Sequence, residues 1–251
     1  WLLEDRDLVY YATDEQRWAW KSDVLESKAD IADNVVEVII ERLRAQPQIQ
    51  QKALLTAACL GSLILDVSTM KIAMGLPSHF GNDMVSKTLD GLVEAGYLSS
   101  EQKLSSTTYR FVHDRIREGS YALLDSEEER LITHLSIGRR LRGAFGSTPK
   151  SDELLLLVSQ LNLGTALMLD PDERRLLAEL NYQAAEVAVL GSAFFPAAAF
   201  LGKGLTLLRD GDKTASWSHH YALNLKLSIA KARMEYCCSR YDQSMAFADD
   251  V

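Results

Sequence analysis

The residues whose types and spacing best suit chemistry are His113 and Asp114, at a predicted change from strand to helix. Residues 109–113 alternate aromatic residues and histidine with arginine and valine, which is the period of a strand, and apolar residues recur at helical spacing from Ile116 onward. An imidazole at such a junction can donate to a phosphate or to a backbone carbonyl. Asp114 falls in the first helical turn, where backbone donors favour a carboxylate and Asp commonly caps. By residue type alone, a buried structural histidine is the more common outcome.

The remaining histidines predict no second site. His219 and His220 are adjacent on a predicted helix, so their side chains point about 100° apart and cannot chelate one metal as residues at helical spacing can. They are expected on a solvated face. His134 is expected at the surface or an interface, and His79 at the start of a helix.

Catalytic and metal chemistry find no support in the sequence. No Gly-x-x-x-x-Gly-Lys-Ser/Thr loop occurs, so this chain alone is not expected to hydrolyse ATP. Cys59 lies in an apolar helical stretch, where a buried thiol is the default. Cys237 and Cys238 are adjacent and offer neither metal-ligand spacing nor a disulfide framework. We therefore expect no catalytic residue and no metal site here.

The composition is typical of a globular protein. The 251 residues are 47% hydrophobic and 25% charged, with a formal net charge of -8 that disfavours nucleic acid as a partner. The longest apolar runs fall short of the roughly 20 residues of a membrane-spanning helix, so no membrane contact is expected. With only three cysteines and no disulfide framework, we expect a reduced compartment and a cytoplasmic location. The chain begins at Trp1 and ends at Val251 inside a predicted helix, so we expect a fragment of a longer protein.

The first half of the chain predicts helices followed by a β-hairpin. Residues 1–32 are expected to be the hairpin tail of a preceding domain, with strands at 8–11 and 17–20. Asp33 is an N-cap candidate for a helix ending near Ala45, and the next helix is expected from Pro47 to Gly61. Two more helices are expected from 66 and over 77–95, with Phe80, Met84, Val85, Leu89, Leu92 and Val93 facing inward. A two-stranded wing at 97–98 and 108–112 completes the order of a winged helix, which we place at 33–145 together with its C-terminal helices.

The second half is almost entirely helical. Helices are expected over 113–124, 127–141, 153–167, 172–190, 195–208 and 216–236, with a linker at 143–149. Their spacing suits antiparallel pairs, and small residues at packing positions favour tetratricopeptide-like repeats over 150–251, cut off before the array is complete. A single irregular helical bundle is the alternative. The predicted fold class is thus mainly α: a winged helix with a small β wing, followed by an antiparallel helical-repeat array.

The segments Asp33 to Gly61 and Phe111 to Leu124 resemble the predicted-ATPase region of hybrid serine/threonine kinase–sensor histidine kinase signalling proteins. In that family an AAA-like NTPase of the signal-transduction (STAND) type precedes a winged helix and helical repeats. Related innate-immunity receptors carry Met-His-Asp at the equivalent junction, and their histidine senses the ADP phosphate. Val112 replaces that Met. The resemblance implies that His113 is an ADP phosphate sensor and that ATP or ADP with Mg binds an NTPase domain upstream in the same protein.

Three functions remain open on this basis. The leading one is a regulatory fragment of a STAND-type ATPase, in which the winged helix senses nucleotide and the repeats bind an unidentified protein partner. The second is a helical scaffold without nucleotide sensing. The third is a winged-helix DNA-binding regulator, whose recognition helix over 80–95 would carry three acids and the lone Lys87, an arrangement that repels phosphates.

Overall fold

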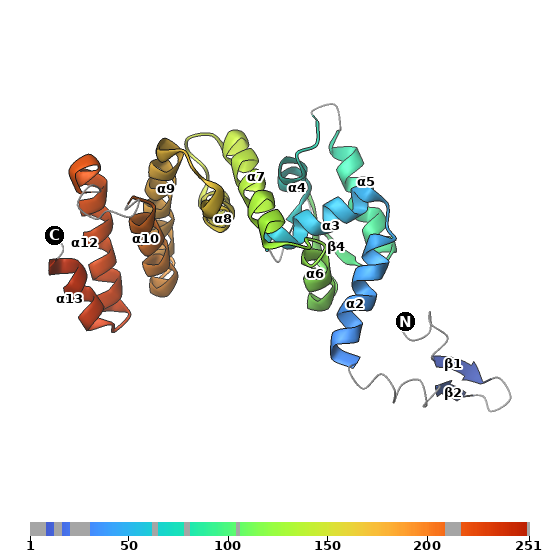
Figure 1. The fold of residues 1–251 in the computed structure, drawn as a ribbon. Coiled ribbons are helices and arrows are strands. Elements are labelled where there is room, and N and C mark those ends of the chain that lie inside the picture. The colour runs from blue at the N-terminus through green and yellow to red at the C-terminus, as the bar shows by residue number, and fades with distance from the viewer. Residues whose placement is uncertain are drawn as a thin grey trace.

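The computed structural model describes residues 9–12, 17–20, 31–61, 65–77, 81–103, 106–208 and 217–249. The protein is mainly helical, with a small three-stranded antiparallel sheet and a separate two-stranded one. The larger sheet lies among the helices of the first half, and helices α7 to α13 follow it in a curved row (Figure 1). In the described part of the chain, no helix has the length and apolar content needed to cross a bilayer.

The two-stranded sheet near the N-terminus pairs β1 (Val9–Ala12) with β2 (Arg17–Trp20). The strands are antiparallel, with Val9 opposite Trp20. The hairpin strands predicted at 8–11 and 17–20 are therefore confirmed within one residue. The predicted turn between them lies outside the described residues.

Helices α2 (Ile31–Arg44) and α3 (Gln48–Leu60) meet at a tight corner. Asp33 lies inside α2, so the prediction that it caps this helix is wrong; the helix already includes Ile31 and Ala32, and alanine is the best helix former. Pro47 is the N-cap of α3, one residue before the helix that it was predicted to start. Gly61 ends α3 in the left-handed conformation at φ +63°, as predicted. The Gln51 side chain closes the corner by donating to the carbonyls of Arg44 and Gln46, at 2.9 and 2.7 Å.

The three-stranded sheet has the order β3-β5-β4. Its strands are β3 (Leu65–Asp66), β4 (Leu98–Lys103) and β5 (Ser106–Phe111). The sequence predicted the β4–β5 hairpin but not β3, because two residues are too short to display a period. Leu65 of β3 pairs with Tyr109 of β5.

Helices α4 (Val67–Met74) and α5 (Asn82–Glu94) separate β3 from β4. Asp66 is the N-cap of α4, so this helix begins one residue after its predicted start at 66. α5 begins at Asn82 rather than at 77, and the predicted core residue Phe80 lies outside the described residues. Among the other predicted core positions, Leu89 and Leu92 are fully buried, whereas Met84 is 40% exposed and was wrongly placed inside.

Helices α6 (Asp114–Tyr121), α7 (Glu127–Phe145) and α8 (Ser151–Leu163) follow the sheet. A short 3-10 turn, η1 (Thr165–Leu167), comes after α8. α7 continues four residues beyond the predicted end at 141 and takes up part of the predicted linker. α7 and α8 approach closely, since a Cβ at Gly138 would lie 2.6 Å from Leu161, and one at Gly164 would lie 2.6 Å from Leu135.

The last helices are α9 (Pro171–Leu190), α10 (Phe194–Leu208), α12 (Tyr221–Cys237) and α13 (Tyr241–Asp249). α9 packs on α10, α10 on α12, and α12 on α13. The sequence predicted the first three of these and gave no separate helix for α13. A reciprocal pair of amides joins α8 to α9: Asn162 donates to Asn181 at 2.8 Å, and Asn181 donates back at 3.0 Å.

Candidate functional site at the start of helix α6

The candidate site lies where β5 passes into α6. The Val112 amide donates to the carbonyl of Tyr97 at 3.2 Å, which holds the chain beside β4 for one more residue. His113 then takes an extended conformation and is the N-cap of α6, with its Nδ1 accepting from the backbone N–H of Arg115 at 3.1 Å. Asp114 is in the first turn, as predicted, but the imidazole occupies the capping position.

This capping bond fixes where the His113 ring can carry its proton. A ring nitrogen that accepts a hydrogen bond has no hydrogen of its own, so the neutral imidazole carries its proton on Nε2. His113 is exposed, so Nε2 is an N–H donor at the surface. The general expectation of a buried structural histidine is therefore wrong at this position.

The charges around His113 are balanced in pairs. Asp114 pairs with Arg117 at 3.3 Å, and Arg115 pairs with Glu118 at 2.9 Å, each three residues apart on exposed helix surface. Exposed pairs of this kind contribute little to stability. What the junction offers to a ligand is thus a helix N-terminus together with one imidazole donor, a combination that favours an acceptor with negative charge.

α6 is packed firmly despite being short. Gly119 faces α2, where a Cβ would lie only 2.7 Å from Cγ2 of Ile39, so the two helices approach closely at this point. Ile116 is buried, and the buried Ser120 hydroxyl donates back to the Ile116 carbonyl at 2.7 Å. Gly119 was not among the residues predicted to matter from the sequence. Its signal was a small residue on the apolar face of an otherwise charged helix.

The far end of α6 leads into a buried chain of polar side chains. Tyr121 Oη lies 3.0 Å from Nε2 of His134, and Nδ1 of His134 lies 2.9 Å from Oε1 of Gln160. The Gln160 amide donates to the carbonyl of Cys59 at 2.9 Å. His134 is only 3% exposed, so its predicted surface or interface position is wrong. The available signal was Gln160, a polar residue in the strongly apolar run 154–161.

Cys59 contributes a backbone carbonyl to this chain, not its thiol. Burial raises the pKa of the Cys59 thiol to about 12, so it stays protonated at neutral pH. This agrees with the predicted buried, unreactive thiol.

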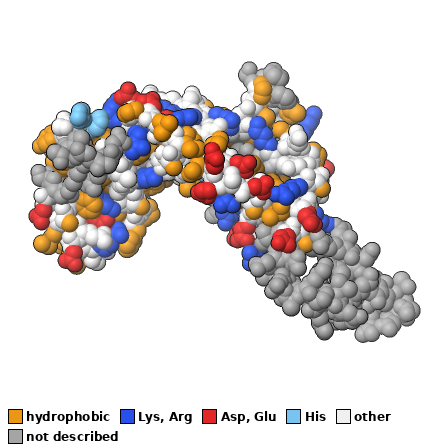
Figure 2. All heavy atoms as spheres, in the orientation of Figure 1, with side chains coloured by type: hydrophobic (Ala, Val, Ile, Leu, Met, Phe, Trp, Pro, Cys, Tyr) orange, Lys and Arg blue, Asp and Glu red, His pale blue; other side chains and the backbone are white. Residues whose placement is uncertain are grey.

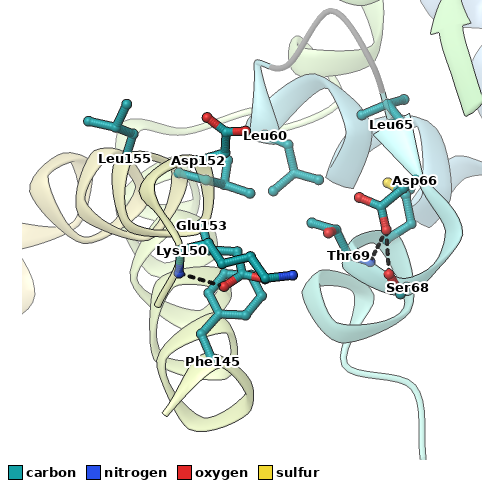
Figure 3. Close-up of a pocket in the computed structure, with 12 residues that line it drawn as sticks. Leu60, Leu65, Asp66, Ser68, Thr69, Phe145, Lys150, Asp152, Glu153 and Leu155 are labelled. Atoms are coloured by element: carbon teal, nitrogen blue, oxygen red, sulfur yellow. Dashed lines mark hydrogen bonds between the residues drawn. The ribbon is translucent and has the colours of Figure 1, made fainter. Parts of the chain in front are cut away.

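A pocket of about 640 Å³ lies between α4 and the turn that joins α7 to α8. Asp66, Ser68 and Thr69 line one wall, and Phe145 and Lys150 the other (Figure 3). Two of its three acids are engaged locally: Asp66 accepts from Ser68 and from the Thr69 amide, and the Lys150 amide donates to Glu153. Burial alone would raise the pKa of Asp66, but these hydrogen bonds outweigh it, and the pKa is lowered. The carboxylate therefore acts first as a helix cap.

A second hollow, of about 490 Å³, lies between α9 and α12. Tyr182 and Val189 of α9 line it together with Leu201 of α10 and Arg233 and Met234 of α12. Its lining is more apolar than that of the first pocket. It therefore suits a partner that brings apolar side chains.

The other residues considered from the sequence lie apart from the junction. His219 is exposed and His220 half-buried, with ring centroids 6.4 Å apart. Cys237 is exposed, and His79 falls outside the described residues. Within the described ranges, no group of His, Cys, Asp and Glu is arranged to hold a metal ion.

The comparisons with known proteins point to signalling. The chain is similar to hybrid signal transduction histidine kinase G of Dictyostelium discoideum, at 23% identity over 296 aligned residues that include 96% of the chain. The chain spans only 8% of the length of that protein. No family model matches the chain, and no solved structure does. This distant similarity supports a signalling context, as the resemblance in the sequence suggested.

Proposed function

We propose that this chain is a regulatory region of a signalling protein, in which a winged helix responds to nucleotide and a helical array binds a protein partner. The order helix α3, strand β3, helices α4 and α5, and hairpin β4–β5 supports a winged helix. The antiparallel pair α9–α10, followed by α12–α13, supports tetratricopeptide-like repeats. The similarity to a histidine kinase supports the signalling role.

The nucleotide belongs to a STAND-type NTPase domain upstream in the same protein, which binds ATP or ADP with Mg. The winged helix closes over that domain when ADP is bound. His113 Nε2–H then donates to a phosphate oxygen, while Nδ1 keeps its bond to the Arg115 amide. A hydrogen bond to a charged group contributes about 1.5–3 kcal/mol, enough to bias a two-state equilibrium by tenfold or more.

The observation that carries this proposal is the exposed imidazole donor at the N-terminus of α6. Helix N-termini bind phosphates readily, and a donor fixed by its own capping bond is already oriented. Asparagine caps helices as well as any residue, whereas alanine caps poorly. This difference separates the sensing role of His113 from its capping role.

The test compares His113→Asn and His113→Ala in the full-length protein. Loss of a phosphate contact predicts that both variants release ADP about ten times faster than wild type or more. Only His113→Ala should also destabilise α6. A full-length protein that binds no nucleotide, or an unchanged ADP release rate in His113→Asn, contradicts the sensing role.

A second candidate is a helical interaction scaffold without nucleotide sensing. The hollow between α9 and α12 favours it, because an apolar lining beside Arg233 suits a protein segment with apolar side chains and a neighbouring acid. Val189→Glu would introduce a charge into this hollow without touching α6. If the chain is such a scaffold, partner binding is lost in Val189→Glu and unchanged in His113→Asn.

DNA binding receives less support. The exposed charged residues of α5, the candidate recognition helix, are Asp83, Lys87, Asp90 and Glu94. Asp90 also accepts a hydrogen bond from Tyr109 at 2.8 Å. On the face shown in Figure 2, basic and acidic side chains are interspersed and form no continuous basic strip. A basic patch or strip is the usual electrostatic footprint of a DNA-binding surface.

A further inference from the structure

The buried polar chain at the end of α6 has a defined direction. The Cys59 carbonyl can only accept, so the Gln160 group that faces it is the amide NH₂, and Oε1 of Gln160 faces His134. That oxygen can only accept, so Nδ1 of His134 carries the hydrogen. In the neutral ring, Nε2 must then accept, and Tyr121 donates its hydroxyl hydrogen to it.

Each inner member of the chain therefore uses one donor and one acceptor. His134 is 3% exposed and Gln160 is 1% exposed, so the bond between them is shielded from solvent. Tyr121 is half-buried and lines a hollow of about 260 Å³ together with His134. With a neutral His134 ring, reversing any one bond would place two donors or two acceptors face to face elsewhere in the chain. Loss of one of these hydrogen bonds therefore weakens the others more than it would in a set of isolated pairs.

The chain joins helices that are distant in sequence. Tyr121 ends α6, His134 lies in α7, Gln160 lies in α8, and Cys59 lies near the end of α3. α6 thus carries His113 at one end and the first member of the chain at the other, eight residues on. A displacement of α6 acts directly on the hydroxyl that starts the chain.

The guanidinium of Arg130 also holds the Tyr121 ring in position. It lies 5.4 Å from the centre of the Tyr121 ring, and Arg130 belongs to α7, as His134 does. The ring is therefore held against α7 by a cation–π contact independent of the hydroxyl. Tyr121→Phe removes the hydroxyl but leaves the ring and this contact.

We infer that Tyr121, His134 and Gln160 form a directional hydrogen-bond relay that couples α6 to α8, so that the state of the α6 N-terminus reaches the helical array. Its role in nucleotide signalling rests on the function proposed above, but the mechanical coupling does not. These three residues are positioning residues: they act through helix placement and touch no ligand.

The first test reads the His134 tautomer by ¹⁵N NMR of the histidine-labelled chain. The relay requires a protonated Nδ1 and a hydrogen-free, accepting Nε2, with the Nε2 resonance moving in Tyr121→Phe. His113 provides an internal reference, because its geometry requires the opposite tautomer. A proton found on Nε2 of neutral His134 overturns the inferred direction.

The second test measures coupling by amide hydrogen exchange along α8. Loss of the cap in His113→Ala frays α6 and, through the relay, should speed exchange at residues 158–163 about threefold or more, as a lost cap permits. In the Tyr121→Phe background the same change should have no further effect on α8. His113→Asn, which keeps a cap, should leave exchange unchanged. An equal response of α8 with and without the Tyr121 hydroxyl overturns the relay.

These measurements separate the relay from nucleotide sensing. If His113→Asn leaves ADP release unchanged while α8 responds as stated, the relay holds and the sensor proposal fails. If ADP release changes while α8 responds equally with and without the Tyr121 hydroxyl, His113 senses nucleotide and the relay is wrong.

Discussion

The two ends of α6 use the same kind of side chain in opposite ways. At its start, the exposed His113 accepts from a backbone amide through Nδ1, which leaves Nε2 as the donor. Beyond its end, His134 is buried and uses both nitrogens inside the protein. A histidine is available to a ligand only when one of its ring nitrogens makes no hydrogen bond within the protein. This difference also separates the two regions: substitutions near His134 should mainly lower stability, and substitutions at His113 should mainly weaken ligand binding.

The largest expected loss of stability is that of Gly164→Ala, at the contact between α7 and α8. The new Cβ would lie 2.6 Å from Cβ of Leu135 and 2.8 Å from its backbone, so α7 and α8 must separate. We expect a loss of about 3 kcal/mol in the free energy of unfolding, measured by urea denaturation. Gly143→Ala is the matched control: it lies on α7 with nothing within 4 Å of the new Cβ, and it should stabilise α7 slightly. Equal stability of the two variants would show that α7 and α8 are not tightly packed.

Replacing His134 should have the next largest effect. His134→Leu leaves the buried Gln160 oxygen without its donor, at a cost of about 2–3 kcal/mol. His134→Gln retains a donor and an acceptor and should recover part of that loss. Thermal or urea unfolding of the two variants checks this order. If leucine is tolerated as well as glutamine, the polar chain contributes little to stability.

The contrast between the two histidines also marks what sequence could foresee. Local rules were sufficient where one residue decides the structure, as with Pro47 before α3, Gly61 after it and Asp66 at the start of α4. They failed for β3, whose two residues form a strand only because β5 lies beside them. They failed for His134 because its partners come from α6 and α8, and helical spacing does not show which helices will surround a residue.

For the candidate site, the strand-to-helix change at His113 was predictable from its alternation and the helical spacing that follows. The exposure of the ring and its role as the cap were not, since both depend on how β5 leaves the sheet. The length of α7 was also missed. Gly143 was interpreted as a breaker, yet it is an exposed position where a helix tolerates glycine at modest cost.

His113→Ala should destabilise the protein by about 1 kcal/mol, the usual cost of a lost N-cap. His113→Asn should unfold at nearly the wild-type urea concentration. Substitutions of His113, at the start of α6, should therefore lower stability less than substitutions of His134, beyond its end. A loss in His113→Asn as large as that in His134→Leu would erase the distinction between the two ends.

The smallest expected effect is the pH dependence at Asp66 and Glu173. The Arg139 guanidinium, bonded at 2.8 and 2.7 Å, holds the pKa of Glu173 below its usual value against the effect of burial, and the pKa of Asp66 is also lowered. A carboxylate with a lowered folded pKa stabilises above its unfolded pKa, and the contribution disappears as the pH falls through the folded value. Stability should therefore decline below about pH 4. Urea midpoints from pH 7 to 3 measure this, and Asp66→Asn, which caps without titrating, should decline less.

The paired amides of Asn162 and Asn181 have a consequence for how the sequence can change over time. Each side chain both gives and receives a hydrogen bond, and Asn181 also donates to the Leu177 carbonyl, so one position cannot change alone without leaving a buried amide unmatched. Sliding α9 along α8 by one residue would break both bonds at once. The two positions should therefore covary: relatives that keep this helix register should have two amides here or two apolar residues, and seldom one of each.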